Sequence, residues 1–171
     1  MRVWAALALV GCAGTTAVGP RPLPESGGTL IYPLGPEARC SRGYDAGAQH
    51  FALDLATAEG APVRASAAGV VVRAAPQRDY GRMVVLDHRD GLYTLYAHLS
   101  AVAVSLGERV DEGEVIGSVG HTGDASGDHL HWEVVRAPAP LAIRPDGPIG
   151  IPGDVFRVDP ALEVASPCSP R

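Results

Sequence analysis

Short apolar runs, each bounded by glycine or another turn-forming residue, recur along most of this 171-residue chain and restrict the folds open to it. Residues 69–74 (GVVVRA) and 82–87 (RMVVLD) are apolar runs of strand length, and residues 92–99 follow the second closely. Arg89-Asp90-Gly91 lies between the runs 82–87 and 92–99, and Asp-Gly is favoured where a hairpin turn needs a positive φ. No long segment repeats at the helical period. The sequence therefore predicts an all-β fold, a compact antiparallel β-sandwich with a groove.

Further elements are expected around these runs. Residues 101–106 and 115–119 are typical of strands, and residues 29–34 suggest an entry strand. Residues 137–153 contain many prolines, each of which removes a backbone donor, so they are predicted to be irregular. Residues 155–164 are expected to close the domain.

Two of the runs place metal-binding side chains at every second position. In HFALDL these are His50 and Asp54, and in HLHWEV they are His129 and His131. A β-strand points successive side chains to opposite faces, so each run is expected to bury one face, Phe51 included, and to present polar groups on the other. Two histidines and an aspartate from two such strands make a three-ligand zinc site with one position open, as catalytic zinc requires. The pattern predicts a zinc hydrolase.

Length and charge exclude several other classes. The chain length favours a single domain. A formal charge of −5 with no basic stripe argues against nucleic acid as a partner. No apolar segment is long enough to span a bilayer as a helix.

The N-terminus is expected to be a targeting segment. Arg2 precedes a short apolar stretch that ends in Leu-Val-Gly-Cys, which resembles the lipobox of bacterial lipoproteins. That resemblance implies a signal peptide over residues 1–11 and lipidation of Cys12. Residues 12–28 are predicted to be a flexible tether, and Ala13 resembles the pattern that sorts lipoproteins to the periplasmic face of the outer membrane. The alternative is an ordinary secretory signal that happens to contain a cysteine.

The remaining two cysteines, Cys40 and Cys168, form an even pair in an oxidising compartment. Cys40 lies near the start of the predicted catalytic domain, residues 29–165, and Cys168 lies in a short tail, residues 166–171. A disulfide between them is favoured over two free thiols.

Ordered motifs over residues 47–135 carry a family resemblance. They are HFALDL, GAPVRASAAGVVVRAA, DYGRMVVLDH, GLYTLYAHLS, VSLGERVDEGEVIGSVGHTG and GDHLHWEV. In this order and spacing the chain resembles the lysostaphin/LytM-type zinc endopeptidases, which have the duplicated-hybrid-motif β fold. The resemblance implies a cell-envelope enzyme that holds one Zn²⁺ per chain and cleaves peptide cross-links of peptidoglycan.

Carried over position by position, the resemblance implies His50, Asp54 and His131 as zinc ligands. It implies His98 and His129 as the catalytic histidines. One of these takes the proton of the attacking water and the other steadies the oxyanion, and the sequence does not say which.

Several neighbours of these residues have two readings each. Tyr80 either lines the groove or is a turn aromatic, and Glu133 either orients a metal ligand or is a surface carboxylate at a strand end. Asp128 adds negative charge that is expected to act on His129. His88 is expected to be exposed beside the hairpin turn, and His121 to lie in a loop.

Two other functions compete with hydrolysis. Relatives that have lost part of the metal set act as non-catalytic, cell-wall-binding activators of amidases, but the set is complete here. A biotinyl or lipoyl carrier domain needs a lysine at a turn, and the chain contains no lysine. A regulatory protein acting in trans stays open as a partner.

Overall fold

The computed structural model describes residues 29–137, 156–164 and 168. Within them the regular elements are β-strands and one 3-10 helix, η1 (Pro160–Leu162). The strands are β1 (Arg39–Arg42), β2 (Leu53–Ala56), β3 (Pro62–Arg64), β4 (Gly69–Arg73), β5 (Arg82–Asp87), β6 (Leu92–Leu99), β7 (Ala101–Val102), β8 (Arg109–Val110), β9 (Val115–Ser118), β10 (His129–Arg136) and β11 (Phe156–Val158). In this part of the chain no helix is long and apolar enough to cross a membrane.

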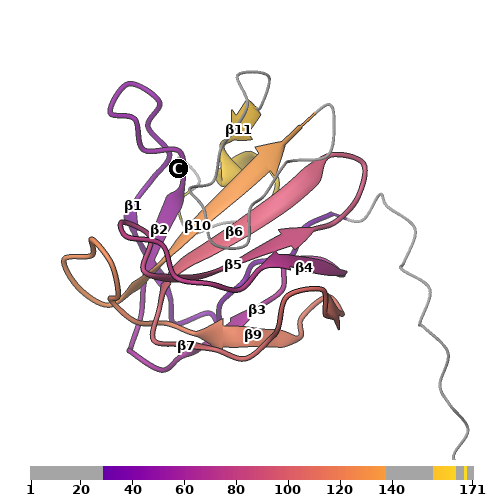
Figure 1. The fold of residues 1–171 in the computed structure, drawn as a ribbon. Coiled ribbons are helices and arrows are strands. Elements are labelled where there is room, and N and C mark those ends of the chain that lie inside the picture. The colour runs from indigo at the N-terminus through magenta and orange to yellow at the C-terminus, as the bar shows by residue number, and fades with distance from the viewer. Residues whose placement is uncertain (1–28, 138–155, 165–167, 169–171) are drawn as a thin grey trace, which may run out of the picture.

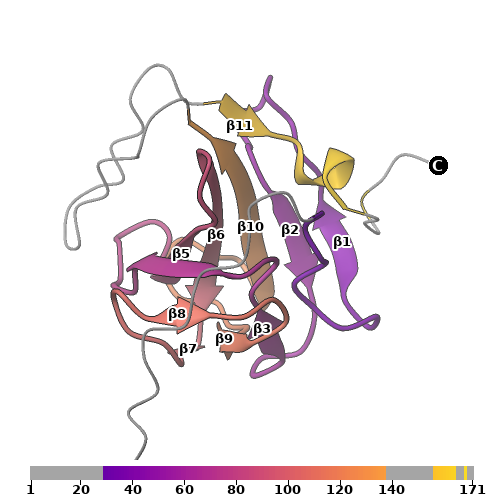
Figure 2. The same cartoon turned by 90° about the vertical axis from the view of Figure 1, so that its right-hand side faces the viewer.

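The strands form two antiparallel sheets (Figures 1 and 2). The large sheet has eight strands, with β1, β2, β10, β6, β5, β4 and β8 in that order and β11 added beside β10. The small sheet has three, in the order β3, β9 and β7. β2 pairs with the first half of β10 and β11 with its last residues, so both lie on the side of β10 opposite β6. The predicted all-β antiparallel architecture is confirmed.

The main core fills the space between the two sheets. Leu53 and Leu55 of β2 and Leu130 and Trp132 of β10 enter it from the large sheet, and each is at most 1% exposed. The small sheet contributes residues of β3 and β9. Because alternate residues of a strand face opposite ways, burying these four leaves the residues between them on the other face of the large sheet.

Two expected strands differ from the structure. Residues 29–34 form no strand, because Pro33 has no N–H to donate, although Leu30 and Leu34 are buried. The run predicted over 101–106 is a strand only at Ala101–Val102. Beyond it the chain turns: the backbone N–H of Ser105 donates to the Glu108 carboxylate at 2.8 Å, and Gly107 has a φ of +83°.

The hairpin between β5 and β6 is present as predicted, and it buries a histidine that was expected to be exposed. Arg89, Asp90 and Gly91 all have positive φ. His88 is only 7% exposed, because both ring nitrogens have partners: Nδ1 lies 3.0 Å from the Ala68 carbonyl and Nε2 lies 2.7 Å from the Thr94 hydroxyl. The exposed-loop prediction for His88 was wrong because these tertiary contacts draw the ring inward.

Cys40 of β1 and Cys168 are joined by a disulfide, as expected, with their Cα atoms 5.1 Å apart. β1 is the terminal strand of the large sheet and pairs there with β2. The disulfide therefore ties an edge strand to the C-terminal end of the chain. The predicted signal peptide, the tether and most of the proline-rich segment lie outside the described residues.

Candidate metal centre and active site

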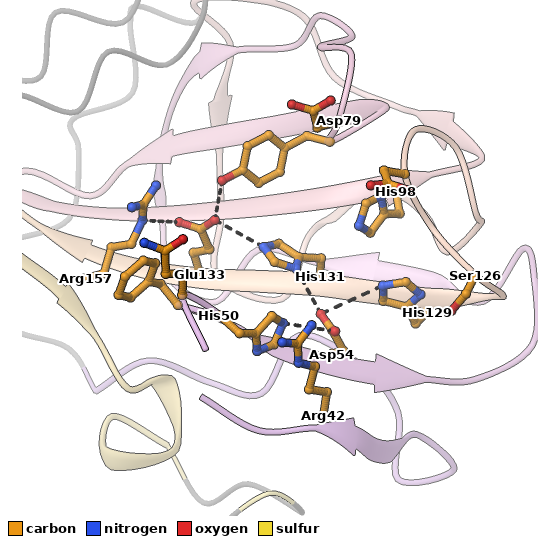
Figure 3. Close-up of a pocket in the computed structure, with 14 residues that line it drawn as sticks. Arg42, His50, Asp54, Asp79, His98, Ser126, His129, His131, Glu133 and Arg157 are labelled. Atoms are coloured by element: carbon orange, nitrogen blue, oxygen red, sulfur yellow. Dashed lines mark hydrogen bonds and ion pairs between the residues drawn. The ribbon is translucent and has the colours of Figure 1, made fainter. Parts of the chain in front are cut away.

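A groove lies on the face of the large sheet that points away from the small sheet. Its floor is formed by polar side chains of β2 and β10, and its walls come from the segments 42–51, 79–80 and 124–126 and from Arg157 of β11. His129, His131 and Glu133 reach the groove because Leu130 and Trp132, which alternate with them, are buried in the core. Figure 3 shows these side chains converging on Asp54 and Glu133.

Strand register places the predicted metal ligands together. Asp54 is the cross-strand partner of His131 on one side and of Arg42 on the other, so the three residues form a row across β1, β2 and β10. Asp54 Oδ1 lies 2.9 Å from His131 Nδ1, and Asp54 Oδ2 lies 3.0 Å from His50 Nε2. One ligand atom from each of His50, Asp54 and His131 lies within 4.8 Å of the other two.

His50 reaches the row from outside the strand. It forms an isolated bridge with Asp45 just before β2, and Gln49 beside it has a φ of +56°. The alternation predicted for HFALDL therefore begins only at Leu53. Phe51, expected in the core, is half-buried and lines the groove instead.

The donor set fits a zinc ion. His50 Nδ1 lies 2.8 Å from the Gly43 carbonyl, which can only accept, so Nδ1 carries the proton and Nε2 presents a lone pair. Within the described structure that Nε2 is buried and makes no hydrogen bond. A buried imidazole nitrogen without a hydrogen bond, beside a carboxylate and a second imidazole, is the donor set of a three-ligand zinc site.

His131 lies between two carboxylates. Its Nδ1 faces Asp54, and its Nε2 lies 3.1 Å from Glu133 Oε1. Burial alone would lower the pKa of His131, but the hydrogen bonds to Asp54 and Glu133 and their charges raise it to about 9. Burial favours the neutral form of Asp54, but its hydrogen bond with His131 and the neighbouring histidines hold the pKa of this carboxyl below its usual value. Zinc would take the place of a proton here.

The two histidines predicted to be catalytic come from the neighbouring strands β6 and β10 and face each other, with ring centroids 4.7 Å apart. His98 Nδ1 lies 2.8 Å from the Thr122 carbonyl, and His129 Nδ1 lies 2.8 Å from the Gly127 carbonyl. Since carbonyls only accept, each neutral ring carries its proton on Nδ1 and can accept another on Nε2. Burial lowers the pKa of His98, which keeps its ring neutral near pH 7.

His98 also has an unusual backbone. Its φ is +60°, and its N–H donates to the Tyr80 carbonyl at 2.9 Å. A side-chain-bearing residue in this region is strained unless its surroundings hold it. The segments that contain Tyr80 and Thr122 hold it from both sides and so fix the ring over the groove.

Tyr80 and Glu133, each left with two readings by the sequence, both belong to the groove. The Tyr80 hydroxyl donates to Glu133 Oε1 at 2.7 Å, and the Glu133 side chain is almost fully buried. Burial and the Glu133 charge raise the pKa of Tyr80, so the hydroxyl stays protonated. Burial favours neutral Glu133, but hydrogen bonding to His131 and the charge of Arg157 hold its pKa below the usual value.

Some residues depart from the sequence prediction. Asp128, expected to act on His129, pairs with the exposed His121 at 2.7 Å, and neither lines the groove. Arg157 and Arg42 do line it, and the sequence reasoning did not find them. The only signal for Arg157 was its position in the predicted closing element.

Comparisons with known proteins agree with this geometry. The chain is 49% identical over 84 residues to the DD-carboxypeptidase/endopeptidase Mpg of Neisseria meningitidis, which covers 49% of this chain and 19% of that protein. The chain thus spans about a fifth of the length of this curated relative. A zinc-containing peptidase from Vibrio cholerae is similar in structure, with a TM-score of 0.59 and 30% identity over 62% of this chain and 36% of that one.

Lysostaphin from Staphylococcus simulans aligns with a TM-score of 0.61 and 26% identity, over 74% of this chain and 48% of that one. Residues 48–143, more than half of the chain, match the sequence profile of peptidase family M23. This segment contains the three candidate ligands and both facing histidines. The chain belongs to peptidase family M23.

Proposed function

We propose that this protein is a zinc-dependent endopeptidase that hydrolyses peptide cross-links of bacterial peptidoglycan. The observation that carries the proposal is the gathering of two imidazoles and a carboxylate in one groove, with two further histidines facing each other beside them. Membership of family M23 and the similarity to Mpg, a DD-carboxypeptidase/endopeptidase, support the reaction class. Similarity to ShyA of Vibrio cholerae, a peptidoglycan DD-endopeptidase, supports the substrate.

His50, Asp54 and His131 would hold the ion. Bound there, zinc supplies Lewis acidity, which polarises the peptide carbonyl and makes water a better nucleophile. Glu133 keeps His131 oriented through its 3.1 Å contact with Nε2.

His98 and His129 provide the proton transfers. Each is fixed through Nδ1 by a backbone carbonyl and so presents Nε2 to a substrate in the groove. One accepts the proton of the attacking water, and the other, when protonated, steadies the oxyanion and returns a proton to the leaving amine. The Tyr80 hydroxyl donates its one hydrogen to Glu133 and so helps to hold the carboxylate that orients His131.

The test is digestion of purified sacculi by the zinc-loaded chain, with released fragments identified by mass spectrometry and metal content measured in parallel. We expect about one zinc per chain and release of uncross-linked peptides. His131→Ala should lose both zinc and activity, whereas His129→Ala should keep zinc and lose activity. His121→Ala, an exposed histidine outside the groove, is the matched control. A folded wild type that binds no zinc would instead favour the non-catalytic activator.

We also propose that Cys12 carries a lipid anchor that holds the enzyme at the periplasmic face of the outer membrane. The lipobox-like Leu-Val-Gly-Cys supports this. In cells, Cys12→Ser should move the protein from the membrane fraction to the soluble fraction. A membrane-bound Cys12→Ser protein would refute the anchor.

A further inference from the structure

Arg157 occupies a position in the groove to which the proposed reaction assigns no role. It belongs to β11, which continues the edge of β10 beyond the end of β2. Its side chain is 26% exposed and lines the groove together with the metal-binding residues. Figure 3 shows Glu133 between Arg157 and His131.

The side chain is held in place before any ligand arrives. Its Nε donates to Glu133 Oε2 at 3.1 Å, and its guanidinium carbon lies 4.9 Å from the centre of the Phe51 ring. The Tyr44 hydroxyl donates to the Arg157 backbone carbonyl at 3.2 Å. A guanidinium fixed in this way loses little conformational entropy when it binds a ligand.

The negative charge of Glu133 does not fully neutralise Arg157. Glu133 also accepts hydrogen bonds from Tyr80 and His131, so its charge is shared among three donors. Glu133 uses only the Nε–H of Arg157. A guanidinium has four further N–H groups on its two terminal nitrogens, and the Tyr80 hydroxyl, which also interacts with Arg157, occupies only part of them. These groups match the two oxygens of a carboxylate.

The other charged residues of the groove make the part near Arg157 the most favourable for an anion. Arg42 and Arg157 are the arginines that line the groove in the described structure, and Arg42 stands in the same cross-strand row as Asp54. Asp79 and Asp124 lie together on the wall that also carries Tyr80, where the Asp124 N–H donates to the Asp79 backbone carbonyl at 2.8 Å. A carboxylate would be repelled by that wall and attracted to the arginine side.

We propose that Arg157 binds a free carboxylate of the peptide close to the scissile bond, so that the groove selects acidic peptides. The site is near the cut because only Glu133 separates Arg157 from His131, a candidate metal ligand. This inference rests on the proposed endopeptidase function and adds to it the chemistry that the groove recognises.

The test uses two synthetic cross-linked peptides that differ only next to the scissile bond, one with a free carboxylate and one with its carboxamide. Wild type should prefer the carboxylate. Arg157→Gln should lower kcat/KM for that peptide by roughly 10- to 100-fold, mainly through KM, because a charge-assisted hydrogen bond is lost. The ratio of the two kcat/KM values, carboxylate peptide over carboxamide peptide, should fall toward one in Arg157→Gln. Arg157→Lys should retain part of the preference.

Control variants separate recognition from a general structural effect. Arg109→Gln, on the edge strand β8 outside the groove, should leave both rates unchanged. An equal loss on both peptides in Arg157→Gln would mean that Arg157 only supports Glu133, and would overturn the inference. So would a preference that disappears in Arg42→Gln but survives in Arg157→Gln.

A binding measurement distinguishes failure of the inference from failure of the proposed function. Calorimetry on the zinc-free full chain should show tighter binding of the carboxylate peptide than of the carboxamide, and Arg157→Gln should abolish the difference. If wild type cuts neither peptide yet shows this difference, the proposed function fails and the carboxylate site stands. Equal binding of both peptides by wild type would overturn the site.

Discussion

Replacing Cys40 and Cys168 by serine should lower the free energy of unfolding by up to about 5 kcal/mol. The magnitude follows from the chain that the disulfide closes, because the two cysteines are 128 residues apart in sequence. A cross-link across a loop of that length removes much of the entropy of the unfolded chain, which the double substitution restores. Such a loss is comparable to the whole stability of many domains, so partial unfolding at 37 °C is expected.

The assay is equilibrium unfolding in urea, with Cys12→Ser in every variant so that no third thiol can exchange with the pair. The double variant should have a lower midpoint and a larger m-value, because its unfolded chain is less compact. Cys12→Ser alone is the control. A loss below about 1 kcal/mol with an unchanged m-value would refute the reasoning, as would two titratable thiols in the denatured, unreduced control.

Three further predictions concern the hairpin, a buried histidine and the metal centre. Gly91→Ala should destabilise the fold by at least about 1 kcal/mol, because the residue has a φ of +74° and an added Cβ would overlap the Ala137 carbonyl; thermal unfolding measures this. Burial lowers the folded pKa of His88 below 6.5, so the unfolded state binds more protons. The stability that neutral His88 contributes should be complete above pH 6.5 and decline as the pH falls toward the folded pKa, and His88→Gln should flatten that part of the stability profile; an unchanged profile would contradict the argument. Glu133→Gln should weaken zinc binding by about 10- to 100-fold in competition with a chelator, because His131 loses a charged hydrogen-bond partner; unaltered affinity would show that Glu133 does not orient the ligand.

The local sequence pattern was sufficient to predict which side chains of β10 face the groove. His129 and His131 alternate with Leu130 and Trp132, and this period of two requires one set to be buried if the other faces the groove. The same reasoning misplaced Phe51. A turn ahead of β2 interrupts the strand there, and the positive φ of Gln49 could not be read from the alternation.

The role of Glu133 could not be predicted from the sequence, because it depends on tertiary contacts. Its spacing placed it on the face of His131, but whether that strand end was buried or exposed depended on what covers it. Tyr80 reaches it from a segment 53 residues earlier and Arg157 from 24 residues later. These contacts turn a carboxylate that could have been solvated into a buried hydrogen-bond acceptor.

By itself, then, the sequence determined the β class of the fold, the antiparallel hairpins and the residues able to bind a metal, because these depend on turn chemistry and on a short repeat along one strand. Only the tertiary structure decided which of those residues meet. Asp54 and His131 are 77 residues apart and come within 2.9 Å because β2 and β10 pair in one register. The burial of His88 and the approach of Arg157 to the groove were decided in the same way, since both depend on contacts between distant segments that no local pattern encodes.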